Sequence, residues 1–239
     1  QAQFDKFAKK LSKASPEEAD ALIDRVYTIA DSLSAAEQDG TFLVFADAME
    51  HTFYQVDSPL RNDDLYLRVL DRESRCNSLM STDYRRIDWK EHILRANAVG
   101  SEVVDLPVSD INGEETSLHR LLDEQTVLLV YGEDCKACTK LMNEAVNSSK
   151  FKKAAEDGQL RLLSLYIGED GEEFAAKSAV LKDWANFIDA RQLVRYENAF
   201  DSRLVPSLYL ISDKKMVKVK GTLSVSEIEK ALDAPALYS

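Results

Sequence analysis

Apolar residues recur at helical spacing through residues 1–98 of the chain. Four segments carry apolar side chains three or four positions apart, which is the pattern of helices that bury one face. Short connections separate these segments, so they predict an antiparallel helical bundle. The inward faces are expected to carry Leu22, Val26, Ile29 and Leu33, then Phe42, Phe45, Met49 and Phe53, then Leu65, Val69, Cys76 and Leu79, and finally Tyr84, Ile87, Trp89 and Ile93.

One helix of this bundle has an explicit start signal. Ser15 is followed three residues later by Glu18, and the two residues form a capping box. Pro16 suits the first helical position, because the amide hydrogen that proline lacks has no intrahelical partner there. The first of the four helices is therefore expected to begin at Pro16.

The pattern changes near residue 99, where apolar runs typical of strands begin to alternate with amphipathic segments. Asn112 and Gly113 separate the first two predicted strands and are a hairpin signal. Such alternation is typical of an α/β domain with a mixed sheet, here over residues 99–239. Strands are expected at 103–108, 115–116, 126–131, 160–167, 208–211 and 216–219, and helices at 117–122, at 139–146, at 174–187 with Trp184 and Phe187 inward, and from Ser224.

Two cysteines lie where the predicted strand 126–131 ends and a helix begins. Cys135 would stand at the helix N-terminus, which lowers the pKa of a thiol and leaves it exposed. Cys138 lies one turn further on, close enough to resolve a mixed disulfide. This placement predicts a thiol–disulfide exchange site.

A proline immediately before the strand 208–211 completes a resemblance. The order of strand, Cys-x-x-Cys helix, βα unit, x-Pro-Ser strand, hairpin and final helix resembles thioredoxin, and the lead-in at 110–118 resembles the extracytoplasmic TlpA/ResA-like branch. The resemblance implies a thioredoxin-like fold over about residues 99–234. It also implies that Cys135 attacks, that Cys138 resolves, and that Pro206 follows a cis bond and, with Val205, helps to hold the substrate backbone.

The helical region ahead of this domain resembles uncharacterised envelope proteins of Gram-negative bacteria. Together with the TlpA/ResA-like resemblance, this implies an exported protein, periplasmic or associated with the cell envelope. Its partners would be protein thiols and disulfides and a redox partner, and no cofactor is expected. The chain begins at Gln1 without a methionine, which suggests a trimmed N-terminus, so any membrane tether would lie in a removed N-terminal segment.

The residues at and beside the cysteine pair depart from the family pattern. Lys136 and Ala137 lie between the cysteines in place of Gly-Pro, Glu-Pro or Pro-His. Asp134 stands where the family usually has tryptophan, and Leu141 stands where the branch often has a glutamate that assists proton transfer. The Asp134 carboxylate opposes thiolate formation unless it serves as the helix N-cap, whereas Lys136 favours a thiolate. A catalytically weak or inactive protein-binding module therefore stays open beside the thiol–disulfide oxidoreductase.

Other chemistry has less support in the sequence. A zinc site would need two ligands beside the cysteine pair, but Cys76 and the three histidines lie at no metal spacing, so no metal is expected. Cys76 is interpreted as a core thiol. A peroxidase is disfavoured because no Thr-x-x-Cys pattern precedes the helix. The net charge of −12 argues against nucleic acid and anionic membranes as partners.

Overall fold

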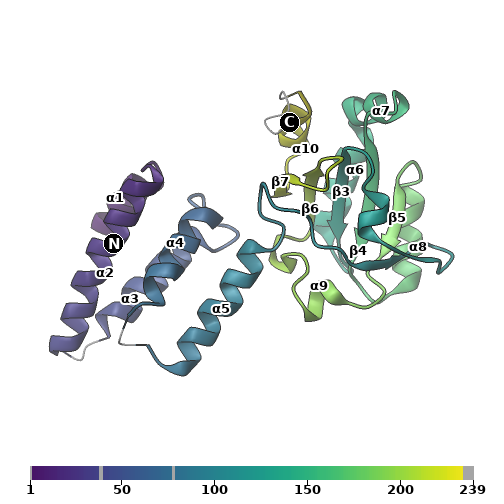
Figure 1. Ribbon diagram of the computed structural model, residues 1–239. Helices are drawn as coiled ribbons and strands as arrows, with labels where there is room; N and C mark the ends of the chain where they lie inside the picture. Colours follow the sequence, from purple (N-terminus) through teal and green to yellow (C-terminus); the bar gives the residue numbers. More distant parts are fainter. Residues whose placement is uncertain (1, 38–39, 77–78, 234–239) are drawn as a thin grey trace. The chain divides into compact units, whose positions relative to one another are not determined.

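The chain divides into two compact units, residues 1–94 and residues 95–239. The computed structural model describes residues 2–37, 40–76 and 79–233 (Figure 1). The boundary expected after residue 98 lies four residues beyond this division. The buried Asn97 side chain accepts a hydrogen bond from the Val104 N–H (2.7 Å) and donates one to the Ala199 carbonyl (2.8 Å), both in the second unit.

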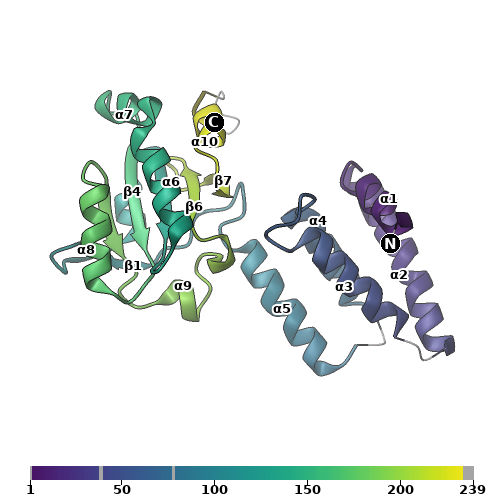
Figure 2. The same ribbon diagram turned by 180° about the vertical axis from the view of Figure 1, so that it is seen from behind.

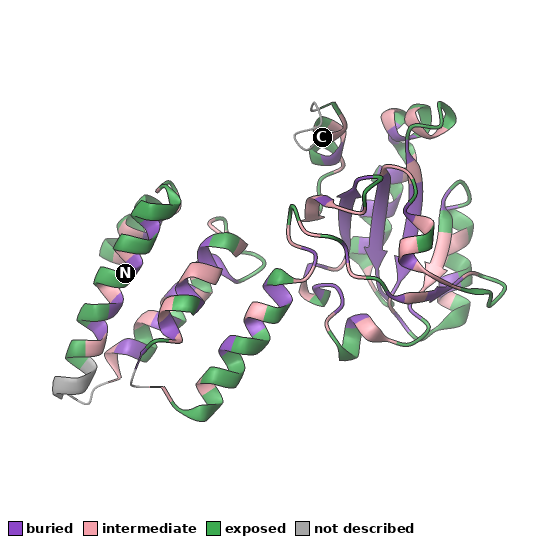
Figure 3. Ribbon diagram, viewed as in Figure 1, coloured by how far each residue is buried: buried purple, intermediate pink, exposed green. Residues whose placement is uncertain are grey.

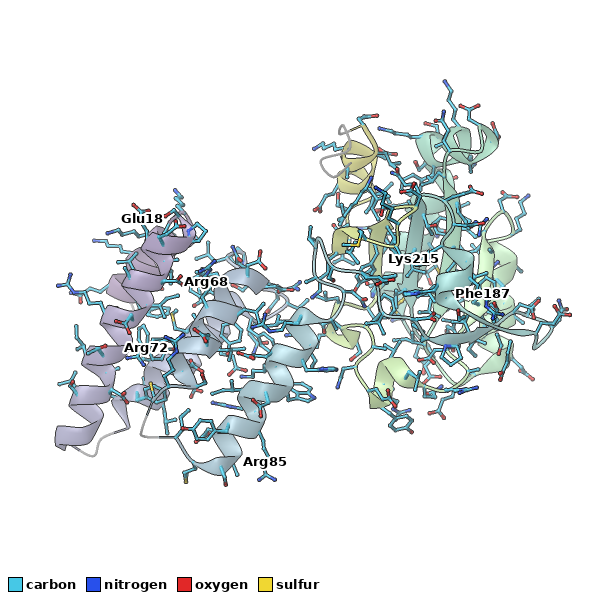
Figure 4. The ribbon with its side chains drawn as sticks, viewed as in Figure 1. Glu18, Arg68, Arg72, Arg85, Phe187 and Lys215 are labelled. Carbon is cyan, nitrogen blue, oxygen red and sulfur yellow. A yellow bond between two sulfur atoms is a disulfide. The ribbon has the colours of Figure 1, made fainter. Side chains whose placement is uncertain are left out.

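The first unit is all-helical, as the periodicity predicts. Its helices are α1 (Ala2–Leu11), α2 (Pro16–Glu37), α3 (Thr41–Phe53), α4 (Asp63–Glu73) and α5 (Ser81–Arg95). The capping box is confirmed, because Ser15 and Glu18 exchange side-chain-to-backbone hydrogen bonds at the start of α2. Arg68 and Arg72, both labelled in Figure 4, reach from α4 to carboxylates on α2. Helix α1 is an element that the sequence reasoning missed.

Two of the predicted inward faces are wrong in part. On α2, Ile29 and Leu33 are 53% and 42% exposed. On α5, Tyr84 and Trp89 are 41% and 49% exposed, although Ile87 and Ile93 on the same helix are buried. The α2 helix has apolar residues on two faces, and the face that packs carries a small residue at each end, which lets neighbouring helices approach closely. The buried α2 residues are Ala19, Ile23, Tyr27 and Ala30.

The other two inward faces are closer to the prediction. Phe42, Met49 and Phe53 on α3 are buried, as are Leu65 and Val69 on α4, while Phe45 and Leu79 are partly buried against the same core. Cys76 is buried as expected, but α4 ends at Glu73, so this thiol lies beyond the helix. Residues 77–78 of the predicted third helix lie outside the described residues.

The second unit is built on a seven-stranded mixed sheet of order β2-β1-β5-β4-β3-β6-β7. The central strands β3, β4 and β5 are parallel, and β6, β7 and the β1–β2 hairpin run antiparallel to their neighbours. Figure 3 shows the middle of this sheet as buried. The strands are β1 (Pro107–Ser109), β2 (Glu115–Ser117), β3 (Thr126–Tyr131), β4 (Arg161–Tyr166), β5 (Ala185–Ile188), β6 (Ser207–Ile211) and β7 (Val217–Thr222).

Helices cover one face of the sheet, with α6 across the middle (Figure 2). The core on that face joins residues of β3, β4 and β6 to Leu141 and Met142 of α6, Phe174 of α8 and Ile228 of α10. The opposite face is covered by the segment before β1, the η1 turn and the segment around Phe200. The remaining elements are η1 (Leu118–Leu121), α6 (Lys136–Asn147), α7 (Ser149–Glu156), α8 (Gly171–Val180), α9 (Leu193–Tyr196), η2 (Ser202–Leu204) and α10 (Val225–Asp233).

The single helix predicted over 174–187 is wrong. Helix α8 ends at Val180, and β5 begins at Ala185. The Asn186 side chain accepts a hydrogen bond from Ser164 on β4 and donates to the carbonyls of Leu181 and Trp184, which closes the turn between helix and strand. Trp184 is buried, but Phe187 is only partly buried in the strand. The spacing of these aromatic residues is compatible with a helix, and only pairing with β4 shows that residues 185–188 form a strand.

Candidate thiol–disulfide exchange site

The cysteine pair lies between β3 and α6. All six residues of β3 are buried, so this strand is a fixed support for the loop that follows it. Cys135 is the N-cap of α6 and forms a disulfide with Cys138, with the two Cα atoms 5.2 Å apart. The N–H of Cys138 also points to Sγ of Cys135, at 3.0 Å. Cys138 is fully buried and Cys135 is half-buried, so Cys135 is the more exposed cysteine of the disulfide.

Asp134 is not the helix N-cap, because Cys135 holds that position. Asp134 is exposed and adopts a left-handed backbone conformation, with φ of 48°. Among non-glycine residues, aspartate and asparagine tolerate that conformation best. The Asp134 N–H donates to the carboxylate of Glu173 on α8, at 3.2 and 3.3 Å from its two oxygens. Lys136 is exposed in the first turn of α6.

The Val205–Pro206 peptide bond is cis, which confirms the expectation from the resemblance. Pro206 is buried and immediately precedes β6, whose Ser207 pairs with Val130 near the end of β3. A Cβ placed on Gly132 would lie 3.6 Å from Cγ1 of Val205. Val205 and Cys135 also pack against the same apolar cluster. The sheet therefore brings residues 205 and 206 to the loop that leads into the cysteine pair.

A lysine and a glutamate on α8 bind the same loop. Lys177 donates to the Gly132 carbonyl at 2.7 Å and forms an ion pair with Glu173. These side chains are only 13% and 24% exposed. The hydrogen bond from Lys177 lowers the pKa of Glu173 below its ordinary value, and the lysine charge acts in the same direction. The two residues are one helical turn apart, with glutamate before lysine, which is the favourable order for such a pair.

The rings of Tyr131 and Tyr166 lie beside this ion pair. The Lys177 ammonium lies 5.8 Å from the ring centroid of Tyr131 and 5.9 Å from that of Tyr166. The Tyr166 hydroxyl donates to Glu173 at 3.4 Å. Burial raises the pKa of Tyr131 to about 12, and burial together with the Glu173 charge raises that of Tyr166. Both phenols therefore stay neutral near neutral pH.

Sequence reasoning missed Glu173 and Lys177. Their i,i+4 spacing is visible in the sequence, but such pairs are common on solvated helix surfaces and indicate no site by themselves. Only the packing of α8 beside the end of β3 directs them to the backbone of Gly132 and Asp134.

The other candidate residues do not join the cysteine pair. Cys76 is a free, buried thiol in the first unit, and burial raises its pKa to about 11. The His119 ring contacts the Val103 carbonyl at 2.6 Å. Within residues 2–37, 40–76 and 79–233, no group of three histidine, cysteine or acidic side chains could hold a metal ion. In those same ranges no helix is long and apolar enough to cross a membrane.

Comparison with solved structures identifies the architecture. The chain is similar to a thioredoxin-like protein from Bacteroides caccae, with a TM-score of 0.84 and 20% identity over 96% of this chain and 81% of that one. It is also similar to the C-terminal domain of an uncharacterised protein from Bacteroides fragilis, with a TM-score of 0.55 and 24% identity over 58% of this chain and 99% of that one. No family model and no curated protein matches.

A third similar structure is a conserved protein of unknown function from Bacteroides fragilis. It has a TM-score of 0.52 and 28% identity over 56% of this chain and 98% of that one. Two of these three structures match little more than half of the chain, whereas the Bacteroides caccae protein matches nearly all of it. The chain therefore has a thioredoxin-like fold preceded by a helical region.

Proposed function

We propose that this chain is a thiol–disulfide oxidoreductase that exchanges disulfides with protein substrates through Cys135 and Cys138. The observation that carries the proposal is the bond between these cysteines at the start of α6, directly after a buried strand. Because Cys138 is fully buried and Cys135 is not, a substrate sulfur would reach Cys135 first.

Exchange begins with the reduced pair. Cys135 loses its proton, and its thiolate attacks one sulfur of a substrate disulfide, whose other sulfur leaves as a thiolate and takes up a proton. Cys138 then loses its proton and attacks Sγ of Cys135, which releases the second substrate thiolate and closes the Cys135–Cys138 disulfide. Two electrons pass to the substrate, and a dithiol partner protein returns them by the reverse steps.

The start of α6 supplies the stabilisation that the attacking thiolate needs. Unpaired N–H groups and the helix dipole place partial positive charge at a helix N-terminus. The Cys138 N–H already lies 3.0 Å from Sγ of Cys135 in the disulfide form. A thiolate on Cys135 would accept that hydrogen bond as a full negative charge, which lowers its pKa.

The TlpA/ResA-like resemblance supports a more specific proposal. Under this proposal the chain acts in the bacterial cell envelope, and Val205 and Pro206 hold the backbone of the substrate beside Cys135. An oxidising compartment suits a protein whose cysteine pair cycles through a disulfide. Location in the envelope is tested by fractionation of cells that express the native gene, and recovery in the cytoplasm alone would contradict it.

Reduction of a protein disulfide such as that of insulin, with glutathione as electron donor, tests the function. Cys135→Ser is expected to lose exchange completely, because the attacking sulfur is gone. Cys138→Ser is expected to accumulate a mixed disulfide at Cys135. Cys76→Ser is the matched control and is expected to leave exchange unchanged, because that thiol is buried in the other unit. Exchange that survives in Cys135→Ser would overturn the assignment.

A protein-binding module without catalysis is the second candidate. Two observations favour it: Asp134 carries a negative charge next to the attacking sulfur, and Leu141, where related proteins often carry glutamate, is buried in an apolar cluster. Wild-type protein that forms the disulfide but fails to exchange it with any protein disulfide would support this candidate over the first.

A further inference from the structure

We propose that Glu173 and Lys177 are positioning residues for Cys135: they hold the loop that carries this cysteine and balance the charge beside its thiolate. The inference rests on the proposed function, because it assigns Cys135 the attacking role. It assigns a role to two residues of α8, a helix that contributes no cysteine.

The contacts of the pair reach both ends of a short loop. Lys177 binds the Gly132 carbonyl at 2.7 Å, and Glu173 accepts the Asp134 N–H at 3.2 Å. The loop is therefore held through its backbone at two points, immediately before Cys135. The ion pair joins these two points into one unit, because the lysine and the glutamate also bond to each other.

The loop needs such support because Asp134 has a φ of 48°. A left-handed conformation is disfavoured for a residue with a Cβ, so it persists only where neighbouring contacts determine it. The hydrogen bond to Glu173 is made by the N–H of this same residue. Loss of the bond would let the backbone relax and would move Cys135, the next residue in the chain.

Burial strengthens these contacts. Lys177 is 13% exposed and is held over the rings of Tyr131 and Tyr166, while Glu173 is 24% exposed. Such placement reduces the choice of rotamers and weakens solvent screening, so this pair differs from an ordinary surface i,i+4 pair.

The pair also sets the local charge. A thiolate on Cys135 adds negative charge to a loop that already carries Glu133 and Asp134. Lys177 opposes that charge and Glu173 adds to it, so the two effects nearly cancel in the wild type. Removal of one partner therefore moves the pKa of Cys135 in one direction, and removal of the other moves it in the opposite direction. This reversal of sign reports the charges of the pair, and the exchange rate of the double variant reports its hold on the loop.

The experiment uses the full chain with Glu173→Gln, Lys177→Met and the double variant. Glutamine keeps an acceptor for the Asp134 N–H but removes the charge. Glu172→Gln and Lys182→Met are matched controls, because both residues are exposed charged residues at or just after α8. The pKa of Cys135 is read from the pH dependence of its alkylation, with peptide mass spectrometry. The equilibrium of the Cys135–Cys138 disulfide with glutathione is measured in parallel.

Lys177→Met is expected to raise the pKa of Cys135 and Glu173→Gln to lower it, each by up to about one unit. The double variant should return near the wild-type pKa, yet its rate of exchange should stay about tenfold low, because the Gly132 carbonyl loses the hydrogen bond from Lys177. Shifts of the same sign, or equal shifts in the two controls, would overturn the proposal. If Lys177→Met fails to fold, Lys177→Arg and Glu173→Gln still test it, since arginine should retain the wild-type pKa.

Neither readout requires catalysis, so the two proposals can fail separately. Wild-type protein that does not exchange with protein disulfides, but whose variants shift the pKa of Cys135 in opposite directions, would contradict the function and retain the positioning role. Active wild-type protein whose variants leave that pKa and the exchange rate unchanged would support the function and contradict the positioning role.

Discussion

Each unit of the chain contains a lysine that lies over two tyrosine rings and is paired with a glutamate. In the helical unit, Lys90 on α5 lies 5.3 Å from the ring centroid of Tyr54 and 5.8 Å from that of Tyr66. Its ammonium is 2.5 Å from the Glu50 carboxylate on α3. The Lys90 side chain is 5% exposed, so burial lowers its pKa although Glu50 opposes the shift.

The second arrangement lies beside the cysteine pair. Lys177 is placed over Tyr131 and Tyr166 at similar distances and is paired with Glu173 on its own helix. The two lysines differ in the group that accepts their second hydrogen bond. Lys90 donates to the Tyr66 hydroxyl at 3.4 Å and joins two helices, whereas Lys177 donates to the backbone of the loop before Cys135.

The same group of side chains therefore serves packing in one unit and placement of a loop in the other. Side chains that bond only to other side chains of a core contribute to stability. Side chains that bond to the backbone of a reactive loop also determine where the reactive atom lies. Changes to the first pair should therefore alter unfolding, and changes to the second should alter the chemistry of Cys135.

The largest effect is expected from Lys90→Met, which should lower the free energy of unfolding of the helical unit by about 3 kcal/mol. Its removal leaves the partly buried Glu50 carboxylate with Arg86, at 3.9 Å, as its charged partner among the described residues. The chain has two tryptophans, Trp89 and Trp184, one in each unit. Urea unfolding followed by Trp89 fluorescence in a Trp184→Phe background measures the loss.

The control for this comparison is the chemistry of the cysteine pair. Lys90→Met should leave the pKa of Cys135 unchanged, whereas Lys177→Met should shift it. If Lys90→Met changed the pKa of Cys135, that result would contradict the proposal that only the Lys177–Glu173 pair acts on this cysteine.

The next effect concerns pH and the buried Glu73, which accepts a hydrogen bond from the Tyr27 hydroxyl. Burial raises the pKa of Glu73 to about 7, although Tyr27 and Lys90 act in the opposite direction. The folded protein therefore holds a proton that the unfolded chain loses above its pKa of 4.5. Stability from this group is complete at acidic pH and is lost as the pH rises through about 7.

Glu73→Gln isolates that contribution, because glutamine still accepts the Tyr27 hydroxyl and does not titrate. The free energy of unfolding of the wild type relative to this variant should fall by about 2 kcal/mol between about pH 5 and about pH 8. Urea unfolding at a series of pH values, followed by Trp89, measures it. A difference that stays constant with pH would show that Glu73 is ionised throughout.

A smaller effect is expected at the boundary between the units. A fragment that begins at Val99 should remain folded, but it lacks the two buried hydrogen bonds of Asn97. A fragment that begins at Arg95 keeps them and should be more stable by about 1–2 kcal/mol. Urea unfolding followed by Trp184 fluorescence compares the two fragments. Loss of cooperative unfolding in both would mean that the units depend on a shared core.

The smallest effect is expected from Asp134→Asn, which removes a negative charge next to Cys135. Asparagine tolerates the same left-handed backbone and keeps the N–H that binds Glu173, so the loop should stay in place. The pKa of Cys135 should fall, and the reduction potential should rise by at most a few tens of millivolts, since about 30 mV corresponds to about one pKa unit. Thiolate absorbance titration measures the pKa, and an unchanged or higher value would show that the carboxylate points away.

The sequence alone determined the helical and α/β regions, most of the strands and the place of the cysteine pair. Strands such as β3 are buried on both faces, so they form short continuous apolar runs, and that length favours a strand over a helix. The Cys-x-x-Cys spacing and the proline before β6 carried the thioredoxin-like resemblance and the cis bond, because those features are local in the chain.

Only the tertiary structure decided which face of α2 is buried, where α8 ends and what holds the loop before Cys135. Helix α2 has two apolar faces, and its neighbours select the one that carries Tyr27. The β5 strand exists because Asn186 and Phe187 pair with β4, which a helical spacing of aromatic residues conceals. Glu173 and Lys177 form an ordinary pair in the sequence, and only long-range packing brings them to the Gly132 and Asp134 backbone, because local spacing carries no information about contacts 39 and 45 residues apart.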